Sequence, residues 1–460
     1  GIGYKQNSEF ISGTININIK TGTIGKKNTS NNIYGGSKNQ NNIDTDKFEE
    51  NSYITIGSTE GSPIIYNTIY GGGINDKLNS TNIEVIGNNR NSYLKIYGAS
   101  NANSVIKTSN ITTNGGYIAE IYGSGNTVGS VDTTNITLDR STVQNVYGAG
   151  NRNSAKTTNI IAKSGNITNI YGGGKDLDTA IENTNISVLN GNITNIYGAG
   201  LNNGAKKTNI IANATTQTSI IENIYGGAKD SGNVNETNVN ILNGSVNNVY
   251  GGNQNGGYTI NSKVNIQKTA EVKNKLFAGG QNSDIGTSGT NGNAILNITG
   301  GTISCDVNGG SDLGKVYGNT FVNIGKEVAQ IEAEKINSGN INIQGDIFGG
   351  GTSEYSQYKL QYDNSQTSEY NFDKVTSVEG NSNINIDGKS TITFANNIYG
   401  TGNASTYSGT SNITIENFGI QKNVKEIKSI QRANNLYIGN SWLEIDGKQD
   451  ILSASNRASY

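Results

Sequence analysis

The sequence predicts an all-β protein that folds as a parallel β-solenoid, in which short strands of successive coils stack on one another. Three observations predict this fold: an aromatic residue that recurs about every 25 residues, short strands with alternating apolar residues, and turns rich in Gly and Asn. We expect a right-handed solenoid of about 14 coils, with loop insertions between some of them.

The first repeated feature is an aromatic residue that follows an apolar residue and usually precedes Gly. From Tyr70 to Phe277 it recurs at steps of 27, 25, 25, 24, 26, 28, 25 and 27 residues. A nearly constant step of this size indicates that each coil is one structural unit stacked on its neighbours. The sequence places these aromatic anchors at Tyr34, Tyr70, Tyr97, Tyr122, Tyr147, Tyr171, Tyr197, Tyr225, Tyr250, Phe277, Tyr317, Phe348, Tyr399 and Tyr437.

The second repeated feature is a short strand phrase of the form Thr-Asn-Ile. Its apolar residues alternate, as in Ile136 and Leu138, so every second side chain points inward. We expect the Asn of this phrase and the aromatic anchors to form ladders along the stack, with amides bonded to each other at the ~4.8 Å coil spacing. The phrase occurs at 134–138, 158–162, 184–188, 208–212 and 237–241.

Two kinds of turn separate these phrases. One is an Asn-Gly pair, as at Asn190–Gly191 and Asn243–Gly244, and the other is a Gly- and Asn-rich stretch after the aromatic, as at Gly172–Gly174. Gly and Asn tolerate a positive φ better than other residues. We therefore interpret the glycines of both kinds of turn as corners of the coil.

The regularity of the repeat divides the chain into four regions. Steps of 40 residues from Phe277 to Tyr317 and of 51 from Phe348 to Tyr399 indicate surface insertions or a skipped anchor. The Tyr- and Ser-rich stretch 354–372 is one such insertion, and 422–433 is the only weakly helical stretch. The regions are irregular coils at 1–69, the regular solenoid at 70–280, coils with longer insertions at 281–420, and a C-terminal coil or junction to a downstream region at 421–460.

Composition excludes several classes of protein. The chain has 34 basic and 36 acidic residues, scattered along its length, so we expect no nucleic-acid partner. Its content of Ile, Val, Thr and Tyr predicts a folded chain. Since no apolar run approaches 18 residues, we expect no membrane insertion in this segment. Since the chain contains no Met, we expect it to be a processed or excised part of a longer protein.

The residues available for catalysis are few. The chain has no His and a single Cys, which excludes His-based triads and Cys or His metal sites. We interpret Cys305 as a small buried residue. Asp176 with Asp178, and Asp306 with Asp312, are the nearest carboxylate pairs, but each pair lies in a turn-like stretch where Asp is expected for local hydrogen bonds. We therefore predict no catalytic residues, no cofactor, and a protein that is not an enzyme.

Calcium is the one metal that the sequence leaves open. Asp76, Asp176 and Asp230 follow Gly-rich turns at a similar offset, as in solenoids that bind Ca²⁺. The corresponding turns of other coils carry Asn151 and Asn202 instead. We therefore expect no repeated metal stripe and no resident metal, although a single Ca²⁺ site stays open as an alternative.

Two sets of residues resemble a known group of proteins. Residues 427–436 and 440–447 resemble a segment of large repeat-bearing surface proteins of anaerobic, low-GC Gram-positive, clostridia-like bacteria. The Tyr-Gly-Gly and Thr-Asn-Ile coils resemble the β-strand repeats of the same group, over roughly residues 70–450. The resemblance implies secretion and attachment to the cell surface, usually without an assigned activity. It carries over no site residues, because the matched pattern is structural.

We therefore expect an extracellular structural or adhesive segment of a bacterial surface protein, acting as a stalk, an adhesin or a fibre subunit. Its expected partners are further copies of the chain, through end-to-end or lateral assembly, or host or cell-wall glycans. The alternative is a glycan-binding or glycan-cleaving β-helix of the polysaccharide lyase or phage tail-fibre type. The tyrosines would serve glycan binding if they lay outside, but their position beside Ile or Val favours a buried ladder.

Overall fold

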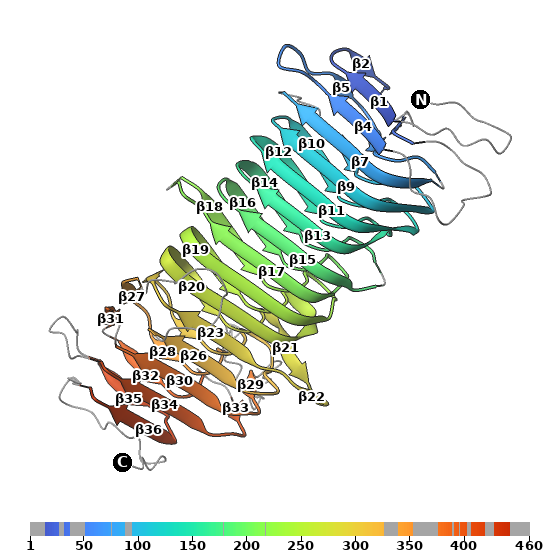
Figure 1. Ribbon diagram of the computed structural model, residues 1–460. Coiled ribbons are helices and arrows are strands. Elements are labelled where there is room, and N and C mark those ends of the chain that lie inside the picture. The colour runs from blue at the N-terminus through green and yellow to red at the C-terminus, as the bar shows by residue number, and fades with distance from the viewer. Residues whose placement is uncertain are drawn as a thin grey trace, which may run out of the picture. The chain divides into compact units, whose positions relative to one another are not determined.

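The computed structural model confirms the predicted fold class. The described residues are all-β, without helix, and their parallel strands stack as a β-solenoid of about 13 turns, close to the number expected. The chain forms two compact units, Gly1–Asn247 and Asn248–Tyr460, shown in Figure 1. The structure describes residues 14–26, 32–36, 51–74, 76–87, 94–177, 179–216, 218–325, 339–352, 376–388, 391–394, 396–402, 406–418 and 427–441.

The first unit holds two parallel columns of strands. The strands up to the unit boundary, which falls within β19, are β1 (Thr14–Ile19), β2 (Thr23–Ile24), β3 (Ile33–Tyr34), β4 (Asn51–Ile56), β5 (Ile64–Ile65), β6 (Thr68–Tyr70), β7 (Lys77–Ile86), β8 (Lys95–Tyr97), β9 (Ser104–Asn114), β10 (Tyr117–Tyr122), β11 (Gly129–Asp139), β12 (Ser141–Tyr147), β13 (Ser154–Ala162), β14 (Gly165–Tyr171), β15 (Ile181–Val188), β16 (Asn192–Tyr197), β17 (Ala205–Asn213), β18 (Ile220–Tyr225) and β19 (Val234–Tyr250). Odd-numbered strands from β7 to β19 form the column of the Thr-Asn-Ile phrase, and even-numbered strands from β8 to β18 form the aromatic column.

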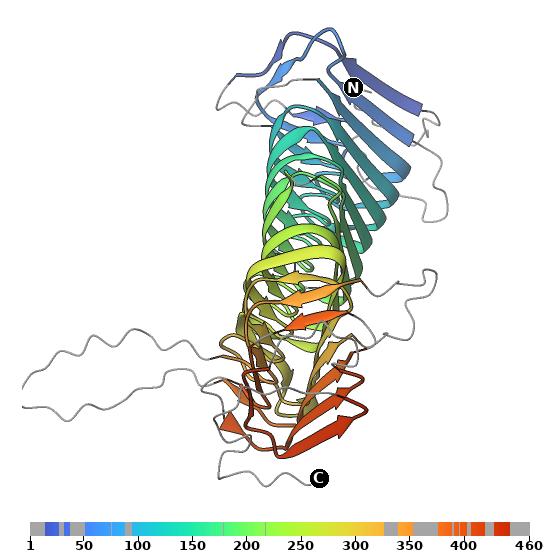
Figure 2. The ribbon, with the colours of Figure 1, turned by 90° about the vertical axis from the view of Figure 1, so that its left-hand side faces the viewer.

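Equivalent residues of successive coils lie in register. In β11 and β13, Thr134 pairs with Thr158 and Ile136 with Ile160. The inward-facing Ile136 and Ile160 are each 1% exposed, because the next coil covers them. The turns between the two columns lie one above another, as Figure 2 shows. This arrangement confirms that alternation along each phrase separates an apolar interior from a polar exterior.

The outward Asn side chains form the predicted amide ladder. The Asn135 amide donates to the Asn110 carbonyl oxygen at 2.9 Å, and the Asn159 amide donates to Asn135 at 2.9 Å. A second amide ladder, which the sequence analysis did not predict, runs along the aromatic column. There Asn169 donates to Asn145 and Asn195 to Asn169, each at 2.8 Å. Each amide therefore bonds to its own copy in the neighbouring coil.

The aromatic anchors of the first unit form a stacked ladder. Ring centroids of successive tyrosines lie 4.5–5.1 Å apart and interplanar angles are 5–11°. Burial raises the pKa of the Tyr70 and Tyr171 hydroxyls to about 12. The expectation of a buried ladder is confirmed, so these rings do not form a surface. The stacked residues are Tyr34, Tyr70, Tyr97, Tyr122, Tyr147, Tyr171, Tyr197 and Tyr225.

The glycine after each aromatic is needed for close packing. A Cβ on Gly172 would lie 2.9 Å from Thr184 Cβ and closer still to the Gly198 carbonyl oxygen. The Thr184 hydroxyl donates to that same carbonyl at 2.5 Å. The expected positive φ is found at Gly191, with φ of 116°, but not at Gly172–Gly174. The chain does bend at Gly172 and Gly173, so the stretch is a corner, but its glycines are needed for close packing and not for a positive φ.

The second unit has three columns of parallel strands that begin at one long strand, β20. The strands of this unit after β19 are β20 (Asn255–Phe277), β21 (Asn282–Thr287), β22 (Thr290–Asn291), β23 (Ala294–Ile298), β24 (Gly301–Ile303), β25 (Val307–Asn308), β26 (Thr320–Ile324), β27 (Ile341–Ile343), β28 (Ile347–Phe348), β29 (Ser377–Val378), β30 (Ser382–Asp387), β31 (Ile392–Phe394), β32 (Asn397–Tyr399), β33 (Thr406–Tyr407), β34 (Ser411–Glu416), β35 (Ser429–Gln431) and β36 (Asn435–Gly439). The columns are β20-β23-β26-β30-β34-β36, β20-β24-β27-β31 and β20-β25-β28-β32-β35.

Two predicted anchors of this unit are wrong. Phe277 pairs with Asn308, which pairs with Phe348, so Asn308 holds the ladder position assigned to Tyr317. Tyr437 lies in β36, the column of the Thr-Asn-Ile phrase, and is 59% exposed. The predictions failed because aromatic spacing cannot reveal a coil whose ladder residue is polar.

The C-terminal coil also differs from its prediction. Residues 427–433 contain β35 and no helix, while 422–426 and the predicted insertion 354–372 lie outside the described residues. At this end the Arg432 guanidinium lies 5.2 Å from the centroid of the Tyr399 ring. The cation therefore covers the last ring of the Phe348–Tyr399 stack.

In the described part of the chain, no helix has the length and apolar character needed to cross a bilayer.

Candidate functional site

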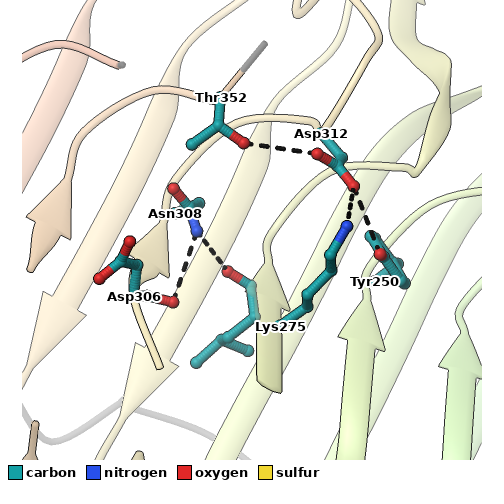
Figure 3. Close-up of polar contacts among 7 residues, drawn as sticks. Tyr250, Lys275, Asp306, Asn308, Asp312 and Thr352 are labelled. Carbon is teal, nitrogen blue, oxygen red and sulfur yellow. Dashed lines mark hydrogen bonds and ion pairs between the residues drawn. The ribbon is translucent and has the colours of Figure 1, made fainter. Parts of the chain in front are cut away.

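The predicted pair Asp306 and Asp312 falls into two separate networks. Asp312 is 2% exposed, and its carboxylate lies 3.1 Å from Lys275 Nζ. It also accepts hydrogen bonds from the Tyr250 hydroxyl at 3.3 Å and the Thr352 hydroxyl at 3.4 Å. Figure 3 shows these groups converging on Asp312, while Asp306 lies apart beyond Asn308. Asp312 therefore links side chains of several coils.

Asp306 instead stacks on Asp346 of the next coil. Its carboxylate accepts a hydrogen bond from the Asp346 backbone N–H at 2.9 Å. Asp346 in turn accepts from the backbone and side-chain amides of Asn397, at 2.9 and 3.1 Å. Burial raises the pKa of Asp306, and the neighbouring Asp346 charge adds to the rise. These carboxylates occupy the position that Asn145 and its equivalents hold in the first unit. Asp346 accepts a side-chain amide bond as Asn145 does, whereas Asp306 accepts a backbone N–H from Asp346.

The carboxylates considered for calcium do not share one column. The backbone N–H of Asp176 donates to Asn151, and that of Asp230 donates in the same way to Leu201. Asp76 is placed differently, since its buried carboxylate accepts from Gly73 N–H at 2.6 Å and from the Ser100 hydroxyl at 2.7 Å. Burial raises the pKa of Asp76. Both carboxylate oxygens of Asp76 are therefore occupied by hydrogen bonds from the protein itself.

Two further observations concern the remaining predicted residues. Asp176 is exposed and accepts a hydrogen bond from the Asn202 amide at 3.0 Å, whereas Asp178 lies outside the described residues. Cys305 is only partly buried, and burial raises the pKa of its thiol to about 12. A thiol with so high a pKa is a poor nucleophile at neutral pH. Over the described ranges, no group of three or more His, Cys, Asp or Glu residues is placed to hold a metal ion.

One feature that the sequence analysis missed is a polar groove in the first unit, with a volume of about 400 Å³. It is formed by the turns of three successive coils, between β13 and β14, β15 and β16, and β17 and β18. None of its lining residues is charged or aromatic. The available signal was the 28-residue step from Tyr197 to Tyr225, the longest of the regular block. The lining residues are Ser164, Gly165, Asn166, Asn190, Gly191, Asn192, Thr216, Thr218 and Ser219.

The groove exists because one coil has a longer turn than its neighbours. The chain passes from β13 to β14 through Lys163 and Ser164, but from β17 to β18 through residues 214–219. The Asn190 side-chain oxygen accepts from the backbone N–H groups of Thr215 and Thr216, each at 3.0 Å, and so holds the longer turn beside the previous coil.

Comparison of the chain with family models, curated proteins and solved structures found no match to any of them.

Proposed function

We propose that this chain is an extracellular structural or adhesive segment of a bacterial surface protein, acting as a stalk, an adhesin or a fibre subunit. The observation that carries the proposal is that the repeated residues contact one another between coils. The recurring tyrosines stack on their own equivalents, the recurring amides bond to theirs, and each recurring Thr hydroxyl donates to the carbonyl oxygen of a recurring Gly. The repeated residues thus support a long stack of coils.

Two resemblances support a source among clostridia-like, Gram-positive bacteria. The coils resemble β-strand repeats of their surface proteins, and residues 427–436 and 440–447 resemble a segment of the same group. The outward ladders are amides and hydroxyls, which suit an aqueous exterior. A polar exterior and an interior filled by stacked rings favour a passive or adhesive role over catalysis.

Surface exposure on intact cells tests this proposal. Antibodies raised against the purified chain should label unlysed cells of the source bacterium, and protease added outside should remove the signal. A cytosolic protein in the same cells serves as the control for lysis. Labelling that requires lysis would contradict the proposal.

A second role, self-assembly, is favoured by the terminal coils. In β4 the inward Ile54 and Ile56 are 1% and 0% exposed, whereas the equivalent Ile17 and Ile19 of β1 are only partly buried. At the other end Ile438 is 45% exposed, although its register partner in β34 is fully buried. Among the described strands, β1 and β36 each pair on one side only. A further coil would cover their partly exposed apolar rows, and a second copy of the chain would supply such a coil.

Sedimentation velocity over a dilution series tests assembly. We expect association that weakens when Ile438→Lys adds a charge to the end row. Lys156→Glu, a change at an exposed site on β13, is the control. A monomer at every concentration would contradict this role and leave the surface location untouched.

A further inference from the structure

We propose that the polar groove of the first unit binds a neutral saccharide. This inference gives the proposed adhesive role a binding site, and it rests on that role for its biological meaning. The groove presents amide and hydroxyl groups from three adjacent turns, in a volume of about 400 Å³. Volumes of this order accommodate small ligands such as short oligosaccharides.

The walls of the groove are held in place before any ligand arrives. The Ser219 hydroxyl accepts from the Gly191 backbone N–H at 3.0 Å and shares a hydrogen bond with the Thr216 hydroxyl at 2.7 Å. The Asn192 amide donates to the Asn166 side-chain oxygen at 3.2 Å, and its own oxygen accepts from Ile220 N–H at 3.3 Å. A pre-organised site loses little conformational entropy on binding.

Two polar groups of the groove remain available. Among the residues that the structure describes, the Asn166 side-chain nitrogen and the Thr218 hydroxyl make no hydrogen bond within the protein, and both residues are exposed. An amide N–H₂ donates twice, and a hydroxyl both donates and accepts. These groups match sugar hydroxyls, which also donate and accept.

Charge and apolar surface narrow the ligand class. No described lining residue is charged. Of the nearby charged groups, the Arg140 guanidinium already bonds to the Asn114 side chain, and the Asp139 carboxylate accepts from the Ser164 hydroxyl at 2.6 Å. Leu189 and Ile220, which adjoin lining residues in the sequence, are 36% and 38% exposed. Exposed aliphatic side chains offer contact to the C–H face of a sugar ring, whereas the ladder tyrosines from Tyr70 to Tyr225 are buried. A neutral saccharide therefore fits better than a phosphate or an acidic polymer.

Affinity measurements with a defined panel test the proposal. Neutral probes are maltohexaose, mannohexaose, chitohexaose and a galactan oligomer, and polygalacturonate oligomers are the acidic comparison. Binding to the full chain is followed by saturation-transfer NMR and calorimetry. We expect at least one neutral probe to bind, with a dissociation constant on the order of millimolar for a single shallow site.

Two variants locate the binding. Thr218→Trp fills the groove and should weaken binding by about tenfold or more, while Asn166→Ala removes one donor and should weaken it by about fivefold. Gln144→Trp, at an exposed site of β12, and Thr142→Ala, at the register partner of Asn166, are the matched controls and should bind normally. Circular dichroism melting must show that all four variants fold.

The results separate this inference from the proposed function. Failure of every neutral probe, preference for the acidic oligomers, or full binding by folded Thr218→Trp would overturn the groove as a saccharide site. None of these results bears on surface labelling of intact cells, which tests the proposed function independently.

Discussion

The two units stack their coils by the same rule but treat the aromatic ladder differently. In the first unit tyrosines stack without interruption from Tyr34 to Tyr225. In the second unit Asn308 interrupts the ladder between Phe277 and Phe348, and the Lys275–Asp312 ion pair lies beside the interruption. The difference shows that a stacked ring is not required at every ladder position. A buried polar residue with an ion pair beside it can fill the same place between two coils.

Alkaline pH should produce the largest difference in folding stability between the two units. Below pH 10 the tyrosines are neutral in both the folded and unfolded states, so their stabilisation is fully present. Above pH 10 the unfolded chain loses protons first, and stability falls until pH passes the raised pKa of about 12 of Tyr70 and Tyr171. The effect sums over the ladder, so we expect the first unit to unfold cooperatively near pH 11 to 12.

Far-ultraviolet circular dichroism and absorbance at 295 nm, followed against pH, check this expectation. Replacing Tyr122 and Tyr147 with Phe should raise the midpoint, whereas Tyr250→Phe, in the second unit, should leave it unchanged. Tyrosine ionisation near pH 10 without loss of β structure would contradict the expectation.

Gly148→Val should abolish close packing of two coils in the first unit. A Cβ at Gly148 would lie 2.8 Å from Thr158 Cβ and nearer still to the Gly172 carbonyl oxygen. We expect a loss of about 4 kcal/mol or more in the free energy of unfolding, measured by urea denaturation. Gly289→Val is the control, because its Cβ would meet no atom within 4 Å. Equal effects of the two changes would refute the close-packing role.

Tyr147→Ala should cost about 3 kcal/mol, because it removes a ring stacked on both sides. Asn308→Ala at the equivalent position of the second unit should cost about 1 kcal/mol, since only its amide bonds to Leu276 and Asp306 are lost. Thermal unfolding of both variants measures the difference. A similar cost at both sites would mean that the ladder contributes no more than a pair of hydrogen bonds.

Lys275→Met should destabilise the second unit by about 2 kcal/mol, because the buried Asp312 loses its countercharge. Asp312→Asn should cost less, since the Lys275 side chain is 37% exposed and its ammonium can reach water. Urea denaturation of the two variants ranks them. The opposite order would contradict the role of Lys275 as the countercharge of Asp312.

The sequence predicted the fold, the tyrosine ladder and the amide ladder of the Thr-Asn-Ile phrase, because all three depend on residues that recur at a nearly constant step. It missed the role of Asn308, although Gly309 and Gly310 follow it as Gly172 and Gly173 follow Tyr171. A Gly directly after the ladder residue, which close contact with the next coil requires, is therefore a second marker of the ladder position, and at Asn308 it is present where the ring is not. The groove could not be predicted, because its shape depends on how Asn190 holds a longer turn in space.

The bond from a Thr hydroxyl to the carbonyl oxygen of the Gly that lies 14 residues later has a consequence for how such chains change length. Thr134 closes onto Gly148 and Thr158 onto Gly172 with the same geometry, at 2.6 Å in each case. After a duplication or deletion that runs from one tyrosine to the next, each Thr hydroxyl would still meet the carbonyl oxygen of a Gly in the same geometry. A chain of this kind can therefore gain or lose one coil at a time without creating a new type of contact at the junction.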